Sequence, residues 1–172
     1  MPASQDELFA FLEGLGIGTT TVTHPPLYTV EESQALRGAI DGLHSKNLFL
    51  KDKKGALFLV VAEENAAIDL KRLHERIGAS GRVSFGSAEL MQSLLGVLPG
   101  SVTPFGVIND QPARLTVVLD ETLATAGAVN FHPLVNTATT TIAAADLLAF
   151  LRATGHEPLL LSFSEAATSP DL

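Results

Sequence analysis

Two apolar, β-prone runs joined by a short polar turn constrain the fold of this chain most strongly. Residues 44–51 and 56–62 are rich in Leu, Val and Phe, and the four residues between them read Asp-Lys-Lys-Gly. Apolar β-formers on either side of a glycine-containing turn are typical of a β-hairpin. The sequence therefore predicts an antiparallel hairpin over residues 44–62.

Helical and strand-like segments alternate along the rest of the chain. Ser4 with Glu7, and Thr29 with Glu32, form capping boxes that predict two helices before the hairpin. A second hairpin is expected from residues 105–108 and 114–119. The other expected strands are residues 19–23, 82–85, 128–131, 137–142 and 158–163, and the later helices are residues 69–77, 87–95 and 143–154.

This order of elements predicts the fold class and the domain organisation. Hairpins and helices are interleaved, which indicates an α/β (α+β mixed) domain: a mixed, largely antiparallel sheet or barrel surrounded by helices. No linker or repeat divides the chain. We therefore expect a single domain over residues 1–165, followed by a flexible polar tail over residues 166–172.

Composition limits the class of protein. The chain has 172 residues, of which 46% are hydrophobic and 17% charged, so it can bury a sizeable core and does not resemble a disordered protein. It has no cysteine, which excludes disulfides, thiolate metal sites and a cysteine nucleophile. We recognise no signal peptide and no apolar stretch of about 20 residues. A cytoplasmic location without membrane attachment is expected.

The charge distribution is uneven. The formal net charge is −8, yet residues 46–82 hold eight of the eleven basic side chains and carry +3. A basic patch on an acidic body can bind phosphate at one place and repel it elsewhere. The alternative is a solvated helix face beside a lysine-rich turn, and charge alone does not separate the two interpretations.

Common catalytic and cofactor motifs are absent. The glycine run at residues 14–18 follows a helix pattern where a dinucleotide loop would follow a strand, and there is no P-loop. The five histidines are scattered, without zinc-ligand spacing. We therefore expect no metal and no cofactor, and an enzyme of this sequence would act by positioning and electrostatics.

Three further segments carry a family resemblance. They read Ser-Lys-Asn-Leu-Phe-Leu-Lys-Asp at residues 45–52, Gly-Ser-Val-Thr-Pro-Phe-Gly at residues 100–106, and Asn-Phe-His-Pro-Leu-Val-Asn-Thr-Ala-Thr-Thr at residues 130–140. In this order and spacing the chain resembles the editing domains of bacterial prolyl-tRNA synthetases. It is more closely similar to their freestanding relatives in the YbaK/ProX superfamily, the alanyl-tRNA(Pro) trans-editing deacylases. The similarity covers roughly residues 5–163.

The resemblance implies ester hydrolysis without a metal and assigns residues to it. The catalytic candidates are Lys46, Asn47, Gly100 and His132. The substrate-binding candidates are Ser101, Val102, Thr103, Pro104, Phe105, His44 and Asn136. The tRNA-binding candidates are Lys46, Lys51, Lys53 and Lys54. The implied partners are alanine-charged tRNA(Pro) and prolyl-tRNA synthetase, with no role for DNA.

The residue types suit these roles, although each has a plain structural alternative. On a strand, Lys46 shares a face with His44 and Leu48, and a cation at the lip of an apolar pocket fits a terminal phosphate; it could equally be an exposed sheet lysine. Glycine permits a close backbone approach to a carbonyl, although residues 100–104 could form an ordinary surface loop. Proline after His132 holds the local backbone extended, yet the imidazole could be purely structural. His24 and Tyr28 are expected near the entrance.

Several functions remain open from sequence. The loop at residues 100–106 departs from the G-G-x-S-P-x-G pattern of the cysteine-removing sister group, which favours alanine. The alternatives are a deacylase of another mischarged tRNA, such as Cys- or Ser-tRNA, and a non-catalytic tRNA-binding or synthetase-associated module.

Overall fold

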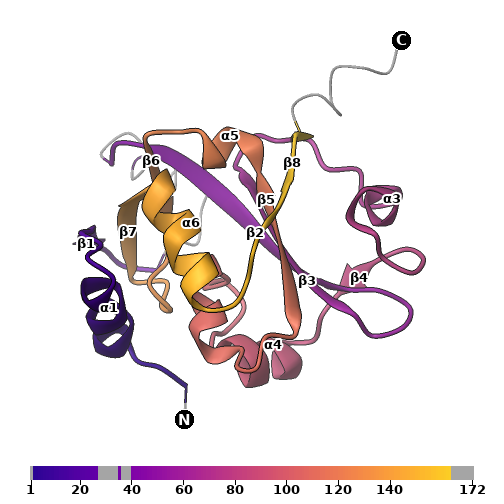
Figure 1. The fold of residues 1–172 in the computed structure, drawn as a ribbon, viewed down its shortest axis with the longest axis horizontal. Helices are drawn as coiled ribbons and strands as arrows, with labels where there is room; N and C mark the ends of the chain where they lie inside the picture. The colour runs from indigo at the N-terminus through magenta and orange to yellow at the C-terminus, as the bar shows by residue number, and fades with distance from the viewer. Residues whose placement is uncertain (1, 27–34, 36–39, 164–172) are drawn as a thin grey trace.

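A computed structural model describes residues 2–26, 35 and 40–163 (Figure 1). Within them a mixed sheet runs in the order β1-β7-β6-β2-β3-β5-β8, and β4 pairs with β2 beside this path. The strands are β1 (Thr20–Thr23), β2 (Leu43–Lys51), β3 (Leu57–Glu63), β4 (Ser84–Phe85), β5 (Leu115–Asp120), β6 (Ala128–Phe131), β7 (Ala138–Ala143) and β8 (Leu159–Leu161). The helices are α1 (Gln5–Gly14), α3 (Leu73–Ile77), α4 (Ala88–Leu95), α5 (Glu121–Ala124), α6 (Ala144–Ala153) and the 3-10 helix η1 (Pro104–Asn109).

The predicted fold class is confirmed, and so is the central hairpin. β2 and β3 pair antiparallel from Ser45 opposite Glu63 to Lys51 opposite Leu57. Gly55 in the turn has φ +87°, a left-handed conformation that favours glycine. Parallel pairs β2–β6, β3–β5 and β5–β8 accompany the antiparallel ones, so the sheet is mixed.

The predicted second hairpin is wrong. Residues 104–109 form η1, because the Thr103 side chain caps its first turn and Pro104 occupies its first position. Strand β5 then pairs in parallel with β3 and β8. The capping box of Ser4 and Glu7 at α1 is confirmed. The helix expected after Thr29 and the polar tail lie outside the described residues.

Two apolar clusters cover the two faces of the hairpin. Alternate residues such as Phe49 and Val61 belong to the main core, together with side chains from α1, α4, η1, α5 and α6. Their neighbours Leu50 and Val60 belong to a second cluster under α3 and Phe163. Strand β3 is therefore buried on both faces. No helix in the described ranges has the length and apolarity needed to cross a membrane.

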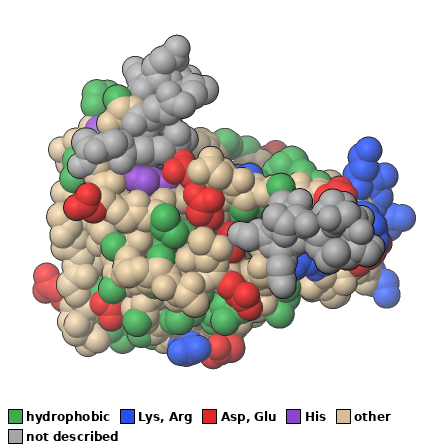
Figure 2. Space-filling view, turned by 90° about the horizontal axis from the view of Figure 1, so that it is seen from above, with side chains coloured by type: hydrophobic (Ala, Val, Ile, Leu, Met, Phe, Trp, Pro, Cys, Tyr) green, Lys and Arg blue, Asp and Glu red, His purple; other side chains and the backbone are tan. Residues whose placement is uncertain are grey.

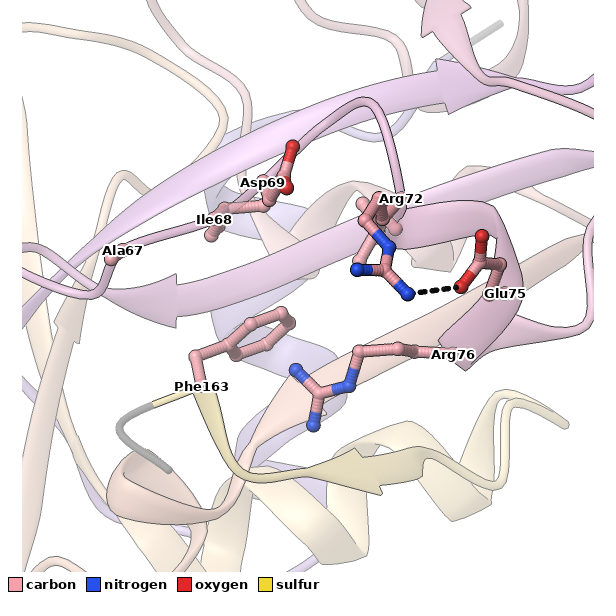
Figure 3. A pocket seen from close by; sticks show the side chains of 8 residues that line it. Ala67, Ile68, Asp69, Arg72, Glu75, Arg76 and Phe163 are labelled. Carbon is pink, nitrogen blue, oxygen red and sulfur yellow. Dashed lines mark hydrogen bonds and ion pairs between the residues drawn. The ribbon is translucent and has the colours of Figure 1, made fainter. Parts of the chain in front are cut away.

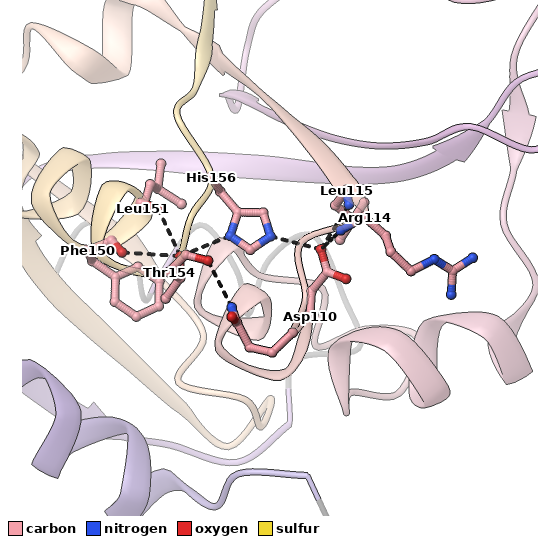
Figure 4. Close-up of polar contacts among 8 residues, drawn as sticks. Asp110, Arg114, Leu115, Phe150, Leu151, Thr154 and His156 are labelled. Atoms are coloured by element: carbon pink, nitrogen blue, oxygen red, sulfur yellow. Dashed lines mark hydrogen bonds and ion pairs between the residues drawn. The ribbon is translucent and has the colours of Figure 1, made fainter.

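A buried polar network ties the end of α6 to the segment before β5 (Figure 4). His156 Nε2 lies 2.8 Å from Asp110 Oδ2, and His156 Nδ1 lies 3.0 Å from Thr154 Oγ1. Asp110 Oδ2 also accepts hydrogen bonds from the backbone N–H groups of Arg114 and Leu115, at 2.9 and 2.8 Å. The network therefore fixes the start of β5.

We predict that His156→Ala lowers the free energy of unfolding by about 1–3 kcal/mol, because it removes a buried hydrogen-bond partner of the Asp110 carboxyl. Chemical denaturation measures this loss. Glu157→Ala is the matched control, since it removes only the exposed ion pair with Arg152 and should change stability by less than about 1 kcal/mol. Equal effects of the two substitutions would contradict the prediction.

Candidate functional site

The first and third sequence blocks meet where β2 pairs with β6. The two strands run parallel, with His44 opposite Asn130. The Ser45 hydroxyl donates a hydrogen bond to the Asn130 carbonyl at 3.2 Å. The Asn130 side-chain amide donates to the carbonyls of Asp41 and Leu43 at 2.9 and 3.2 Å. Asn130 thus joins the two blocks through both its backbone and its side chain.

The second block lies against the third. Gly100 has φ +95°, and a Cβ added there would lie 3.8 Å from the Asn136 side-chain nitrogen. The Phe105 ring packs edge-on against Phe131, with centroids 5.8 Å apart. Thr103 is fully buried, as is Phe105. Ser101 and Pro104 are buried, and Val102 is half-buried and packs against the main core, so few side chains of this loop are exposed.

Lys46 and His44 lie on the face of the sheet opposite the main core. Val129 and Phe131 point into the main core, so Asn130 between them points the other way. Residues opposite each other in neighbouring strands share a face, which places His44 beside Asn130 and Lys46 two residues further along the same face.

The Lys46 ammonium is held at the border of the second apolar cluster. Leu48 and Leu50, on the same face, pack in or against that cluster. Lys46 Nζ donates a hydrogen bond to the carbonyl of Ala66. An ammonium has three N–H donors, so two remain for another acceptor.

Asn47 points to the opposite face from Lys46, toward the main core. Its amide nitrogen donates to the Ser45 hydroxyl at 3.3 Å. Its Oδ1 atom is buried and has no hydrogen-bond partner in the part of the chain that the structure describes. A buried carbonyl oxygen without a donor is costly, and such an atom beside a site is a free acceptor for a ligand.

His24 and His132 lie side by side. Their ring centroids are 6.4 Å apart. His132 Nδ1 donates to the Ala138 carbonyl at 2.9 Å, which leaves Nε2 as the nitrogen with the lone pair. His24 Nδ1 donates to the Pro25 carbonyl, and its Nε2 lies 2.9 Å from the Thr139 hydroxyl. The expectation for Tyr28 falls outside the described residues.

His132 is the imidazole whose environment favours the neutral form. Burial lowers the pKa of His132 below its ordinary value, the hydrogen bond to Ala138 partly opposes this, and the neighbouring His24 lowers the pKa further. His132 is therefore neutral at physiological pH, with an accepting Nε2.

The other predicted lysines lie away from these groups. Lys51 is five residues from Lys46 along β2, about 17 Å in an extended strand, and alternation turns it to the opposite face. Lys53 and Lys54 occupy the turn beyond it and are exposed. In Figure 2, Lys and Arg side chains gather at the end of the molecule where Figure 1 places this turn and α3.

A cavity of about 210 Å³ lies between α3 and the segment after β8 (Figure 3). Arg76 stacks over the Phe163 ring at 5.4 Å and donates to the Ser162 carbonyl, and Arg72 pairs with Glu75 at 3.3 Å. None of the predicted site residues lines this cavity. In the described part of the chain, no cluster of three or more His, Asp or Glu side chains could hold a metal ion.

Comparison with known proteins identifies the fold and its chemistry. The model of the aminoacyl-tRNA editing domain family matches residues 24–150. The chain belongs to this family. The resemblance predicted from the three blocks is confirmed. The protein is an aminoacyl-tRNA deacylase, a hydrolase acting on ester bonds.

Relatives of this editing domain match over nearly its whole length. It is 40% identical over 159 residues to prolyl-tRNA synthetase associated domain-containing protein 1 of Danio rerio, covering 91% of this chain and 86% of the relative. It is 38% identical over 154 residues to the prolyl-tRNA editing protein ProX of Acetoanaerobium sticklandii, covering 89% and 93%. A crystal structure of a candidate trans-editing enzyme for prolyl tRNA synthetase has a TM-score of 0.68 at 22% identity, covering 94% and 98%, which shows the shared fold.

Sequence reasoning gave too little weight to two residues of this editing domain. Asn130 joins the blocks through the contacts described above, and the Thr139 hydroxyl holds the His24 ring. The sequence did contain a signal for Asn130, because it stands inside an otherwise apolar strand. A buried side-chain amide needs hydrogen-bond partners, so such a residue is expected to join neighbouring segments. Thr139 stands in a run of threonines that strand propensity alone explains.

We predict that His132 makes the protein less stable as the pH falls below about 6.5. The unfolded chain then binds a proton that the folded His132 does not, so the free energy of unfolding decreases with falling pH. Thermal unfolding between pH 8 and 5 should show a smaller loss for His132→Gln than for the wild type. An NMR titration in which the His132 ring protonates at or above its ordinary pKa would contradict this.

Proposed function

We propose that this deacylase acts in trans on tRNA(Pro) that carries alanine. The observation that supports this most directly is the adjacency of the three blocks: β2 pairs with β6 at His44 and Asn130, and Gly100 lies beside Asn136. The names of two relatives, at 40% and 38% identity, refer to association with prolyl-tRNA synthetase and to prolyl-tRNA editing, which supports tRNA(Pro) as the substrate. A loop unlike that of the cysteine-removing group favours alanine as the amino acid.

In the proposed reaction Lys46 binds the phosphate of the 3′-terminal adenosine. Its ammonium keeps the bond to the Ala66 carbonyl and offers its two other N–H groups to phosphate oxygens. The position at the edge of an apolar cluster strengthens this charge-assisted contact, because the surroundings screen it less than water does.

The bond-breaking step needs a placed water rather than a protein nucleophile. Water oxygen attacks the ester carbonyl carbon, the bond from that carbon to the ribose oxygen breaks, and the ribose oxygen takes a proton. The neighbouring ribose hydroxyl delivers the water and relays its proton. Backbone N–H groups of the loop at residues 100–104 stabilise the developing oxyanion. The products are alanine and tRNA with a free terminal ribose.

In this proposal the aminoacyl group lies beyond the short β2–β6 ladder, which covers only two residue pairs, so that Asn47 approaches it from the main-core side and His132 from the opposite side. Asn47 Oδ1, which has no partner among the described residues, can accept a hydrogen bond from the α-ammonium of alanine or from a ribose hydroxyl. His132 is neutral, so it can accept through Nε2 without repelling that ammonium. The substrate supplies the donors that these two acceptors lack.

Selectivity rests on size. A synthetase pocket that accepts proline cannot strongly exclude a smaller side chain, since each missing methylene is worth only about 1–3 kcal/mol. A second site that admits alanine and excludes the proline ring removes the error. In this proposal the half-buried Val102 limits the room available to the amino-acid side chain.

We predict that the purified protein releases alanine from Ala-tRNA(Pro) and leaves Pro-tRNA(Pro) intact. A panel that also contains Cys-tRNA(Pro) and Ser-tRNA tests the preference, with loss of radiolabelled amino acid as the measurement. Faster release of cysteine or serine would assign the enzyme to another substrate. Binding of uncharged tRNA without cleavage of any ester would make it a binding module.

We predict that Lys46→Ala lowers kcat/KM for the preferred substrate by about 10- to 100-fold, the loss expected for a hydrogen bond to a charged group. Lys46→Met should behave alike while keeping the aliphatic stem, which separates charge from packing. Lys71→Ala is the control, because Lys71 is an exposed lysine outside the three sequence blocks. Unchanged turnover in both Lys46 variants, with unchanged thermal unfolding, would remove Lys46 from the site.

A further inference from the structure

An exposed aromatic ring stands at the far end of β2. Phe85 in the short strand β4 pairs with Leu50, and Ser84 pairs with Lys51. Phe85 is 60% exposed. Single exposed apolar residues are common on protein surfaces, so the ring has meaning only through what surrounds it.

Four cations lie on the two chain segments that meet at this ring, the β2–β3 turn and the residues before β4, with Lys51 on the opposite face of β2 from Phe85. Lys51, Lys53, Lys54 and Arg82 are all exposed. No ion pair joins any of them to a carboxylate in the described residues, whereas Arg72 and Arg152 are paired with Glu75 and Glu157. Four cations against the single carboxylate of Asp52 in the same turn leave a local excess of positive charge on a protein whose net charge is −8. We call Phe85 together with these four cations the basic platform.

The basic platform is held rigid by Asp52. This buried carboxylate accepts hydrogen bonds from the N–H groups of Ser80 at 2.8 Å and of Lys54 and Ala56 at 2.9 Å. The bond from Ser80 is the main cause of a lowered pKa for Asp52, which burial opposes and the bonds from the turn support. Asp52 thus stays ionised and joins the turn to the segment that leads to Arg82 and Phe85.

A second set of contacts completes the connection. The Lys53 N–H donates to the Ser80 carbonyl at 3.1 Å, and the Gly86 N–H donates to the Phe49 carbonyl at 2.9 Å. The Lys53 stem crosses Gly81 so closely that an added Cβ would lie 2.6 Å from its Cδ. A surface fixed before binding loses little conformational freedom when a ligand arrives.

The distance along β2 between Lys46 and the basic platform sets the length of a ligand that would contact both. Lys46 and Leu50 are four residues apart on β2, about 13 Å in a strand. Paired residues share a face, so Phe85 projects from the same side of the sheet as Lys46. With stacked nucleotides spaced about 3.4 Å apart, this distance corresponds to about four nucleotides, which is about the length of the unpaired 3′ end of a tRNA.

We propose that the basic platform binds the acceptor-stem end of the tRNA. Phe85 stacks on the base where the unpaired 3′ end begins, and Arg82 with the three lysines contacts stem phosphates. The inference rests on the proposed function, since the reacting ester then lies near Lys46. Stacking on an exposed ring beside unpaired cations is typical of nucleic-acid binding. A protein interface would instead have an apolar core depleted of lysine.

The test compares one ester with and without the stem. Deacylation of Ala-tRNA(Pro) and of a 3′-alanylated CCA trinucleotide is measured for Phe85→Ala and Arg82→Gln. We expect Phe85→Ala to lower kcat/KM for the tRNA about tenfold, as for the loss of one stacked base, and to leave the trinucleotide unchanged. Leu160→Ala and Arg114→Gln are the matched controls, because they remove an exposed apolar and an exposed cationic side chain elsewhere.

Binding of uncharged tRNA(Pro), followed by fluorescence anisotropy over a salt series, tests the platform without any cleavage. Phe85→Ala should raise Kd about tenfold, and Arg82→Gln should reduce the salt slope by about one. A wild type that binds tRNA in this way yet cleaves no ester would refute the proposed function alone. Three results would overturn the proposed role of the basic platform. They are wild-type affinity for tRNA in both variants, an equal loss of kcat/KM on the tRNA and the trinucleotide, and a loss of synthetase binding with unchanged affinity for tRNA.

Discussion

The parallel pairing of β2 with β6 is the contact on which the rest of the structure depends. It joins β1, β7 and β6 on one side to β3, β5 and β8 on the other, through Leu43 opposite Val129 and His44 opposite Asn130. A ladder of two residue pairs needs further contacts, and the Asn130 side chain supplies them. Its amide nitrogen donates a hydrogen bond to the Asp41 carbonyl, just before β2, and its oxygen accepts one from the Thr141 hydroxyl at 2.5 Å. Asn130 lies opposite His44, which is two positions before Lys46, and itself stands two positions before His132, so stability and the candidate site depend on one position.

Local signals in the sequence were enough for elements that are held by local contacts. The β2–β3 hairpin follows from two apolar runs and a glycine turn, and α1 from its capping box. The second hairpin failed because Thr103 and Pro104 start a 3-10 helix, and Asp110 then occupies the first N–H groups of β5. Those contacts are local, but the parallel partners of β5 are β3 and β8, which lie far from it in the chain, and sequence period and propensity do not report such pairings.

The candidate site also has features that the sequence predicts and features that depend on packing between distant residues. The resemblance selected Lys46, Asn47, Gly100 and His132, and strand alternation alone predicted that Lys46 shares a face with His44. That Asn47 points to the main core follows from the same alternation. That its side-chain oxygen has no partner among residues 2–26, 35 and 40–163 depends on the packing around it, which the sequence does not show. The neutral state of His132 depends on burial and on His24, more than a hundred positions away in the chain. The family assignment was thus accessible from sequence, and the protonation state was not.

The alternation of β2 has an evolutionary consequence. Inserting or deleting one residue between the β2–β6 contact and Lys46 would exchange the two faces of everything that follows. The ammonium would be driven into the main core and the Asn47 amide would be exposed, so a single indel there removes charge from the site and adds it to the interior. Length variation among natural relatives should therefore be confined to the turns, and the spacing from His44 to Lys51 should be fixed.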